Sequence, residues 1–378
     1  MEMNNSSYYL PSEWQQQVAV QLTWPHAKTD WAPYLEDIVR MELRMADEIT
    51  KREDLIVVTP EKEAVRNLLA PQPTEQQLSS VKIVEMPTDD TWARDHGAIT
   101  LLPTADNEEQ PRKTILLDFC FNGWGKKFPA ENDNRISWHL KCSGVFFDYY
   151  CHNRKKNTVL GDDPETECTM EEHLDFVLEG GSIESDGKGT VFTTSQCLMA
   201  PNRNQPLSKE GIEDYLKRVL CAERIVWLDH GNLVGDDTDG HIDTIVRIAP
   251  DDTILYVKCD DYRDEQFDDF NNLESQLLCL RTKEGKPYRL LPLPMPKAMY
   301  DDGERLPATY ANFLIINGAV LVPTYNQPEL DKKAMDIIQE ACSRTVLKTG
   351  QPSFQYADGI LRDWKKHEVH SLKDVQAL

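Results

Sequence analysis

The sequence predicts an α/β fold, in which short buried strands alternate with amphipathic helices. Three observations support this prediction. Short apolar runs of strand length recur along the chain, helical patterns separate several of them, and a turn with glycine leads into a short strand at three places. The chain has 378 residues and 40% hydrophobic residues, which is enough for a sizeable core. Because no Gly/Ser-rich linker divides it, the sequence favours one domain.

The elements follow in order from local patterns. Apolar residues at steps of three and four predict a helix that is capped by Asp30 and runs to about Lys51. The run Leu55–Val58, which ends before Pro60, is typical of a buried strand, and a helix is predicted over Glu61–Leu69. Further strands are predicted over Val81–Glu85, Ala98–Leu102, Thr114–Phe119, Thr190–Thr194, Ile225–Leu228, Ile242–Ile248, Thr253–Val257, Phe313–Ile316 and Ala319–Val322, and further helices over Ser208–Val219, Phe270–Leu280 and Glu329–Ala341.

A hairpin followed closely by a helix is the repeating theme. Asn317-Gly318 is a type I′ hairpin signal between two apolar runs, and the helix Glu329–Ala341 comes soon after it. Glycine turns lead into strands in the same way at Gly97 and Gly189, which suggests a repeated module. The polar stretch Tyr149–Glu172 is the least regular part, and we expect a surface excursion there.

Charge excludes some function classes. The chain has 41 basic and 64 acidic residues, a net charge of −23, so it disfavours binding to nucleic acid or to an anionic membrane and favours a cationic small molecule. The longest apolar stretch, Tyr310–Tyr325, is too short and polar to span a bilayer, and no secretory signal is visible. The nine scattered cysteines contain no CxxC pair and indicate reduced thiols. We therefore expect a cytoplasmic protein.

His241 and Asp243 are the first candidates for chemistry. They are two residues apart at the start of a predicted strand, so their side chains are expected to share a face. A histidine beside a carboxylate suits acid–base catalysis, although a structural histidine is the more common case. An alternative is a metal-binding loop formed by Asp236, Asp237 and Asp239, but this segment lacks the residue spacing of a calcium-binding loop.

Glu179 and Asp95 are the next candidates. Glu179 follows the apolar residues 176–178 and precedes two glycines, and a carboxylate at the end of a buried strand is costly unless it is paired. Asp95 lies between a basic residue and a histidine, close to Trp92. The alternatives are a surface turn at Glu179 and a local ion pair at Asp95.

Taken together, these residues describe a site for a planar cation. Several carboxylates and a histidine at strand ends match the bidentate hydrogen bonding that a guanidinium favours. Trp92 or Trp124 is placed to cover one face of such a cation. Hydrolysis would need a nucleophile, for which a thiolate is well suited, and a histidine to protonate the departing ammonia and activate water.

Eight stretches, in order along the chain, carry a specific family resemblance. The sequence resembles agmatine deiminases, which belong to the peptidyl-arginine deiminase group of the pentein superfamily. The matching stretches are Leu10-Pro-Ser-Glu-Trp14, Leu22-Thr-Trp-Pro-His26, Asp90-Thr-Trp-Ala-Arg-Asp95, Asp118-Phe-Cys-Phe-Asn-Gly-Trp-Gly125, Leu178-Glu-Gly-Gly-Ser-Ile183, Pro201-Asn-Arg-Asn204, Asp239-Gly-His-Ile-Asp243 and Tyr300-Asp-Asp-Gly-Glu-Arg-Leu306.

The resemblance implies a pentein α/β propeller, with ββαβ modules in pseudo-fivefold symmetry around a central channel. It implies hydrolysis without a metal or other cofactor. By residue-for-residue match, Asp95 and Glu179 would hold the guanidinium, His241 would be the general acid/base, Asp243 would bind guanidinium nitrogens, and Trp92 would line the pocket.

The C-terminus departs from the family pattern. The family nucleophile is a cysteine directly after a histidine, and the nearest counterpart here is Ser371 after His370. Cys342 is an alternative thiol, but its place at the end of a predicted helix is typical of a packing residue. The expected organisation is therefore a pentein domain over residues 1–341 and a divergent tail over 342–378, which replaces the nucleophile segment.

These inferences lead to one main functional prediction and two alternatives. The main one is an agmatine deiminase-type hydrolase, which converts agmatine and water to N-carbamoylputrescine and ammonia in putrescine biosynthesis. The alternatives are a guanidinium-binding pentein without turnover and a peptidyl-arginine deiminase-type enzyme. The expected partner is a small cationic guanidino substrate, and a homo-oligomer is allowed but not indicated.

Overall fold

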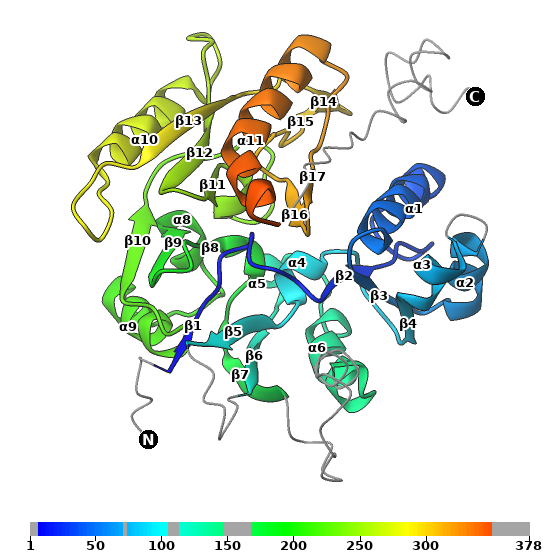
Figure 1. The fold of residues 1–378 in the computed structure, drawn as a ribbon. Helices are drawn as coiled ribbons and strands as arrows, with labels where there is room; N and C mark the ends of the chain where they lie inside the picture. Colours follow the sequence, from blue (N-terminus) through cyan, green and yellow to red (C-terminus); the bar gives the residue numbers. More distant parts are fainter. Residues whose placement is uncertain (1–6, 71–73, 105–112, 147–167, 350–378) are drawn as a thin grey trace. The chain divides into compact units, whose positions relative to one another are not determined.

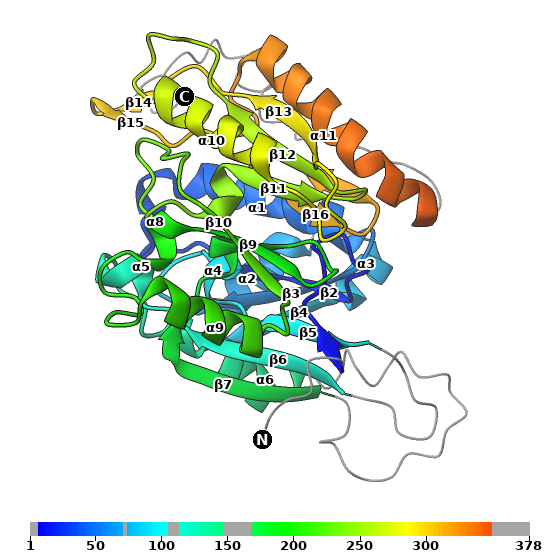
Figure 2. The ribbon, with the colours of Figure 1, turned by 90° about the vertical axis from the view of Figure 1, so that its left-hand side faces the viewer.

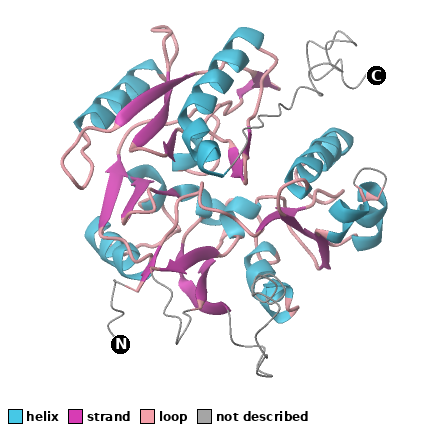
Figure 3. Ribbon diagram, viewed as in Figure 1, coloured by secondary structure: helices cyan, strands magenta, loops and turns pink. Residues whose placement is uncertain are grey.

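The computed structural model describes residues 7–70, 74–104, 113–146 and 168–349. Two compact units divide the chain, Met1–Trp227 and Leu228–Leu378, and each is considered by itself below. The division falls inside the stretch predicted as one pentein domain, while the boundary predicted between residues 341 and 342 stays a prediction. Ser371 and most of the predicted tail lie outside the described residues. Helices and strands alternate along much of the chain, as Figure 3 shows, so the mixed α/β class is confirmed.

Among its described residues, the first unit contains three separate sheets, in the orders β2-β3-β4, β1-β5-β6-β7 and β10-β9-β8. Their strands are β1 (Tyr8–Tyr9), β2 (Ala19–Thr23), β3 (Asp54–Thr59), β4 (Val81–Glu85), β5 (Ile99–Pro103), β6 (Thr114–Cys120), β7 (Cys168–Val177), β8 (Ile183–Ser185), β9 (Thr190–Thr194) and β10 (Arg224–Leu228). Its helices are α1 (Leu35–Thr50), α2 (Lys62–Leu69), α3 (Glu75–Ser79), α4 (Ala93–His96), α5 (Gly123–Lys126), α6 (Ile136–Cys142), α8 (Ser195–Leu198) and α9 (Lys209–Val219).

Strand β3 is the central strand of a parallel sheet, between β2 and β4. Its continuous apolar run is almost entirely buried, because helices and strands cover it from several sides. Helices α1 and α2 lie beside this sheet in Figure 1. The apolar stripe of α1 turns Ile38, Leu43 and Ile49 into the core.

The second sheet and helix α9 share the main hydrophobic cluster of this unit. Ile212, Leu216 and Val219 of α9 are fully buried together with Leu117 of β6 and Val191 of β9. Figure 2 shows α9 alongside the long strands β6 and β7. Because the strands end near the functional residues described below, this core fixes the position of those ends.

The second unit is built on the sheet β11-β12-β13, with two short hairpins β14-β15 and β16-β17. Helices α10 and α11 pack against β12 and β13, respectively. The bounds are β11 (Val246–Ala249), β12 (Thr253–Lys258), β13 (Arg289–Pro294), β14 (Tyr300–Asp301), β15 (Glu304–Arg305), β16 (Leu314–Ile316), β17 (Ala319–Leu321), α10 (Phe267–Cys279) and α11 (Pro328–Thr349).

Several local predictions need correction. A short 3₁₀ helix, η1 (Ala32–Tyr34), precedes α1, whose N-cap is Tyr34 rather than Asp30. In the hairpin β16-β17 only Gly318 of the central pair has a positive φ, so the turn is not type I′, which requires a positive φ at both central residues. Residues 168–172, expected in an irregular excursion, belong to the edge strand β7.

Neither a closed sheet nor a membrane-spanning helix occurs among the described residues. The six sheets have two to four strands each and none closes on itself, so the propeller symmetry stays a prediction. Within the described ranges, no helix combines the length and the apolar character that crossing a bilayer would require.

Candidate active site

Asp95 is buried in the short helix α4, and two donors fix its carboxylate. Its Oδ1 accepts a hydrogen bond from the backbone N–H of Gly181 at 3.0 Å, and its Oδ2 accepts one from Trp124 Nε1, also at 3.0 Å. The residue is 6% exposed. Both oxygens of the Asp95 carboxylate therefore have a defined orientation.

Gly180 allows the two loops that carry the carboxylates to touch. We call residues 92–97 and 178–182 the carboxylate loops. A Cβ atom on Gly180 would lie 2.1 Å from the backbone oxygen of Arg94, a distance that real side chains do not adopt. The contact brings Gly181 within reach of Asp95. The glycine signal at this turn thus reflects close backbone approach rather than a positive φ.

A buried aspartate anchors the chain that leads into the first carboxylate loop. Asp133 is 1% exposed and accepts hydrogen bonds from the backbone N–H groups of Asp89 and Asp90 at 2.8 and 2.9 Å. Burial raises the pKa of Asp133 to about 6. In return, Asp89 accepts two bonds from Asn132. Residues 89 and 90, which precede the first carboxylate loop, are therefore hydrogen-bonded to residues 132 and 133 in both directions.

Aromatic rings surround the Asp95 side of the loops. Trp124 is buried, has a left-handed backbone with φ +52°, and packs edge-on against Trp92 with 5.8 Å between ring centroids. Trp92 is 42% exposed and also contacts Trp31. Trp92, predicted to line the pocket, therefore contacts Trp124, and Trp124 in turn donates a hydrogen bond to Asp95. Its role toward a ligand stays a prediction.

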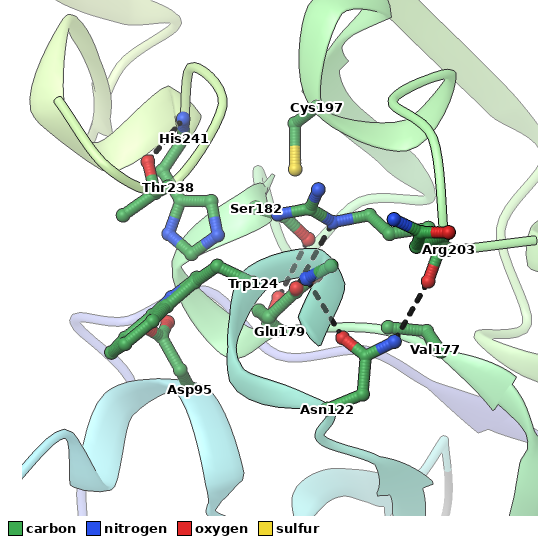
Figure 4. Close-up of polar contacts among 12 residues, drawn as sticks. Asp95, Asn122, Trp124, Val177, Glu179, Ser182, Cys197, Arg203, Thr238 and His241 are labelled. Carbon is green, nitrogen blue, oxygen red and sulfur yellow. Dashed lines mark hydrogen bonds and ion pairs between the residues drawn. The ribbon is translucent and has the colours of Figure 1, made fainter. Parts of the chain in front are cut away.

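Glu179 is fully buried and is paired with Arg203. Arg203 Nε donates to Glu179 Oε1 at 3.0 Å, and neither side chain is exposed to solvent. Figure 4 shows the guanidinium group beside the carboxylate. The second oxygen, Oε2, is buried and has no hydrogen-bond partner among the described residues. The alternative of a solvated surface turn at Glu179 is therefore wrong.

Asn204 links the segment that carries Arg203 to the segment that carries Glu179. Its side-chain amide makes two hydrogen bonds with the backbone of Val177 at the end of β7, at 2.9 and 2.8 Å. Glu179 follows Val177 by two residues, and Arg203 directly precedes Asn204. A further buried group, the Cys197 thiol of α8, lies within 4.8 Å of a Glu179 carboxylate oxygen. The sequence did not identify Arg203, Asn204 or Cys197 as site residues.

In the second unit, His241 is buried and held by its own loop. We call residues 235–244 the histidine loop. Thr238 Oγ1 accepts from the His241 backbone N–H at 3.0 Å, and Asp236 accepts from Thr238 and from the Gly240 N–H at 2.7 Å. The Asp-rich stretch therefore contains an Asp that organises a turn. The backbone oxygen of His241 accepts from Thr244 Oγ1 at 2.8 Å.

The local geometry of His241 and Asp243 differs from the prediction. They do not start a strand: His241 is the N-cap of a 3₁₀ turn, η4 (Ile242–Thr244), and β11 begins only at Val246. The two side chains therefore do not share a face by strand alternation. Both residues are buried, at 2% and 8% exposure. Their catalytic roles stay predictions.

The structure therefore brings together part of the predicted site within each unit. Asp95, Glu179 and Trp124 lie on contacting segments of the first unit, and His241 and Asp243 are both buried in the histidine loop of the second. Of the two candidate nucleophiles, Ser371 lies outside the described residues, and Cys342 is buried inside α11, which extends beyond the predicted end at Ala341. For Arg203 and Asn204 one signal was present, because both belong to the stretch Pro201-Asn-Arg-Asn204 that carries the family resemblance.

Comparison with solved structures places this architecture among the deiminases. The structure titled "Putative Arginine Deiminase from Porphyromonas gingivalis" is 44% identical, covers 94% of this chain and 95% of its own, and has a TM-score of 0.77. A Cys-to-Ser variant of C. jejuni agmatine deiminase with substrate bound is 32% identical, covers 94% and 92%, and has a TM-score of 0.73.

Sequence comparison agrees. A protein named "Putative agmatine deiminase" from Vibrio parahaemolyticus is 32% identical over 88% of this chain and 89% of its own length. A model described as Porphyromonas-type peptidyl-arginine deiminase matches residues 9–350, and the chain therefore belongs to that family. A second model, described as replication initiation and membrane attachment, matches only residues 329–378.

Proposed function

We propose that this protein is an agmatine deiminase-type hydrolase, which converts agmatine and water to N-carbamoylputrescine and ammonia and serves putrescine biosynthesis. The observation that carries the proposal is the pair of buried carboxylates, Asp95 and Glu179, on adjoining loops in a chain of this family. A buried carboxylate is costly unless hydrogen bonds and a cation compensate its charge. A guanidinium offers that charge and a fork of donors.

In the proposed reaction, the carboxylates hold and orient the guanidinium, and Asp243 binds its nitrogens. His241 acts as general acid/base, donating a proton to the departing ammonia and activating the water that enters. Trp92 lines the entrance, and no metal or other cofactor takes part. We expect the chain to adopt the pseudo-fivefold pentein arrangement around a central channel.

The assay measures ammonia and a ureido product from agmatine. The full chain is expected to release both, and His241→Ala is expected to lower turnover far more than it lowers agmatine affinity, because its role is in proton transfer. Absence of turnover in this chain, with turnover in a version whose Ser371 is replaced by Cys, would contradict the activity and assign its loss to the nucleophile.

A second candidate is guanidinium binding without turnover. Ser371 as the counterpart of the family cysteine favours it, since a serine hydroxyl is hardly ionised at neutral pH. The C. jejuni agmatine deiminase variant supports this candidate, because it has a Cys-to-Ser substitution and a bound substrate. Agmatine binding by calorimetry with no product would establish it.

A peptidyl-arginine deiminase-type activity is the third candidate, because the matching family model carries that description. A panel of agmatine, free arginine and arginyl peptides separates it from the first. We expect agmatine to be preferred, since the excess of acidic residues favours a dication. Preference for an arginyl peptide would contradict that assignment.

A further inference from the structure

We propose that Arg203 is a positioning residue for Glu179: it occupies one carboxylate oxygen, Oε1, and so presents the other, Oε2, to the guanidinium of the substrate. This inference rests on the proposed function, because it names what prepares that site. The family resemblance gave Glu179 a partner in the substrate. In the structure Glu179 already has a guanidinium partner from its own chain.

The two oxygens of Glu179 have different surroundings. Oε1 accepts from Arg203 Nε at 3.0 Å, whereas Oε2 is equally buried and has no hydrogen-bond partner among the described residues. A buried carboxylate oxygen without a donor is costly, and such atoms in native proteins call for an explanation. A guanidino ligand that donates to Oε2 supplies that explanation.

Arg203 itself is held before any ligand arrives. On one side, Asn204 bonds twice to Val177, and on the other, Asn122 Nδ2 donates to the backbone oxygen of Asn202 at 2.8 Å. Both neighbours of Arg203 are therefore anchored to other parts of the first unit. A fixed guanidinium restricts the rotation of the Glu179 carboxylate, because rotation would break the Nε–Oε1 bond.

The contact uses Nε of the guanidinium, which a lysine cannot reproduce. Lysine would keep the positive charge beside Glu179 but would offer a rotatable ammonium in place of a planar donor. Arg203→Lys is therefore expected to keep most of the stability and to lose affinity. A merely structural role predicts instead that affinity follows stability, so the two measurements separate the hypotheses.

The experiment measures agmatine affinity by calorimetry and stability by urea unfolding in the full chain. The variants are Arg203→Lys, Arg203→Met and the charge-neutral double variant Arg203→Met with Glu179→Gln. Arg66→Met is the matched control, because Arg66 makes an exposed ion pair with Glu63 in the same unit. We expect affinity about tenfold weaker in Arg203→Lys and weaker still in Arg203→Met, with the control unchanged.

The outcomes distinguish a positioning role of Arg203 from competition with the ligand and from no role in binding. Unchanged affinity in Arg203→Lys would overturn the proposal, and tighter binding in any Arg203 variant would show that Arg203 competes with the ligand. If Arg203→Met fails to fold, Arg203→Lys and the double variant still test the proposal. Agmatine binding by the folded double variant as tight as that of the parent would show that neither Arg203 nor Glu179 belongs to the binding site. A parent chain that binds neither agmatine, arginine nor an arginyl peptide would overturn the proposed function as well.

Discussion

The carboxylate loops and the histidine loop differ in how much of their hydrogen bonding is local. Asp95 bonds to Gly181, 86 residues away, and to Trp124, 29 residues away, and Glu179 bonds to Arg203, 24 residues away. In the histidine loop, Asp236 and Thr238 make bonds that span two to four residues, and the backbone oxygen of Thr244 accepts from Thr309 Oγ1, 65 residues away. The first region therefore depends on tertiary packing, whereas the Asp236 turn of the second is largely formed by its own sequence.

This difference gives the two regions different sensitivities. A change that separates the carboxylate loops is expected to affect stability and ligand binding together, because the same contacts serve both. A change in the Asp236 turn of the histidine loop is expected to affect turnover with little effect on stability, because the bonds of this turn join residues that are close in the sequence. The four predictions below test this contrast, from the largest expected effect to the smallest.

Gly180→Ala is expected to have the largest effect. The added Cβ would lie 2.1 Å from the Arg94 backbone oxygen, so the carboxylate loops must separate. We expect a loss of about 3 kcal/mol in the free energy of unfolding, and weaker agmatine binding. Urea unfolding measures the first. Gly211→Ala in α9 is the control, because its new Cβ would have only ordinary contacts from 3.8 Å. Equal losses in both variants would contradict close loop contact.

His96 is expected to make the first region sensitive to acid. Burial lowers its pKa from 6.5 to about 4, and its Nε2 lies 3.1 Å from Thr23 Oγ1. Between these pKa values the unfolded chain binds more protons than the folded chain, so the stability that His96 contributes above pH 6.5 is lost as pH falls toward 4. The component is about 3 kcal/mol at most.

The measurement is urea unfolding of the parent and His96→Gln at pH 7 and pH 4. We expect the stability difference between the two chains, parent minus variant, to be smaller at pH 4 by about 2–3 kcal/mol. A difference that does not change with pH would mean that His96 titrates normally in the folded chain.

Trp124→Phe removes the indole donor to Asp95 Oδ2 and keeps an aromatic ring. We expect agmatine affinity to fall by about 1–2 kcal/mol, since a buried charged acceptor loses one donor. Trp227→Phe is the matched control, because Trp227 Nε1 donates to the carboxylate of Glu213 away from the loops. Calorimetry should show no change in the control, and an equal fall in both would place the effect outside the site.

Asp236→Ala is expected to have the smallest effect on stability, less than about 1 kcal/mol. It removes the turn that supports Thr238 and His241, so turnover should fall while agmatine affinity stays near that of the parent. Asp186→Ala, which removes a similar Asp turn between β8 and β9, is the control and should leave turnover unchanged. A large loss of stability in Asp236→Ala alone would show that the histidine loop also supports the second unit.

The same contrast explains what the sequence could and could not predict. Continuous apolar runs such as β3 and β12 were found, because burial on both faces leaves a plain signal. Strand β13 was missed because it contains Pro292 and Pro294, which an edge strand tolerates. The edge strand β7 was missed in part, because its first half is polar and borders a charged segment.

For the site, the sequence identified residue types but not long-range partners. Glu179 was correctly singled out as a buried carboxylate that needs pairing. Nothing local names Arg203 as its partner, since β8, β9 and α8 lie between the two residues along the chain. The 3₁₀ turn at His241 was read as a strand because Ile242, Ile245 and Val246 are all apolar and buried.

The measurement that tests the account most directly is calorimetric titration of agmatine into the full chain and into Asp95→Asn. Asn keeps the shape of Asp95 but removes its negative charge. We predict one bound agmatine per chain, with affinity at least about tenfold weaker in the variant. Equal affinity in the two chains, or no binding by the parent, would contradict the claim that the carboxylate loops hold a guanidinium.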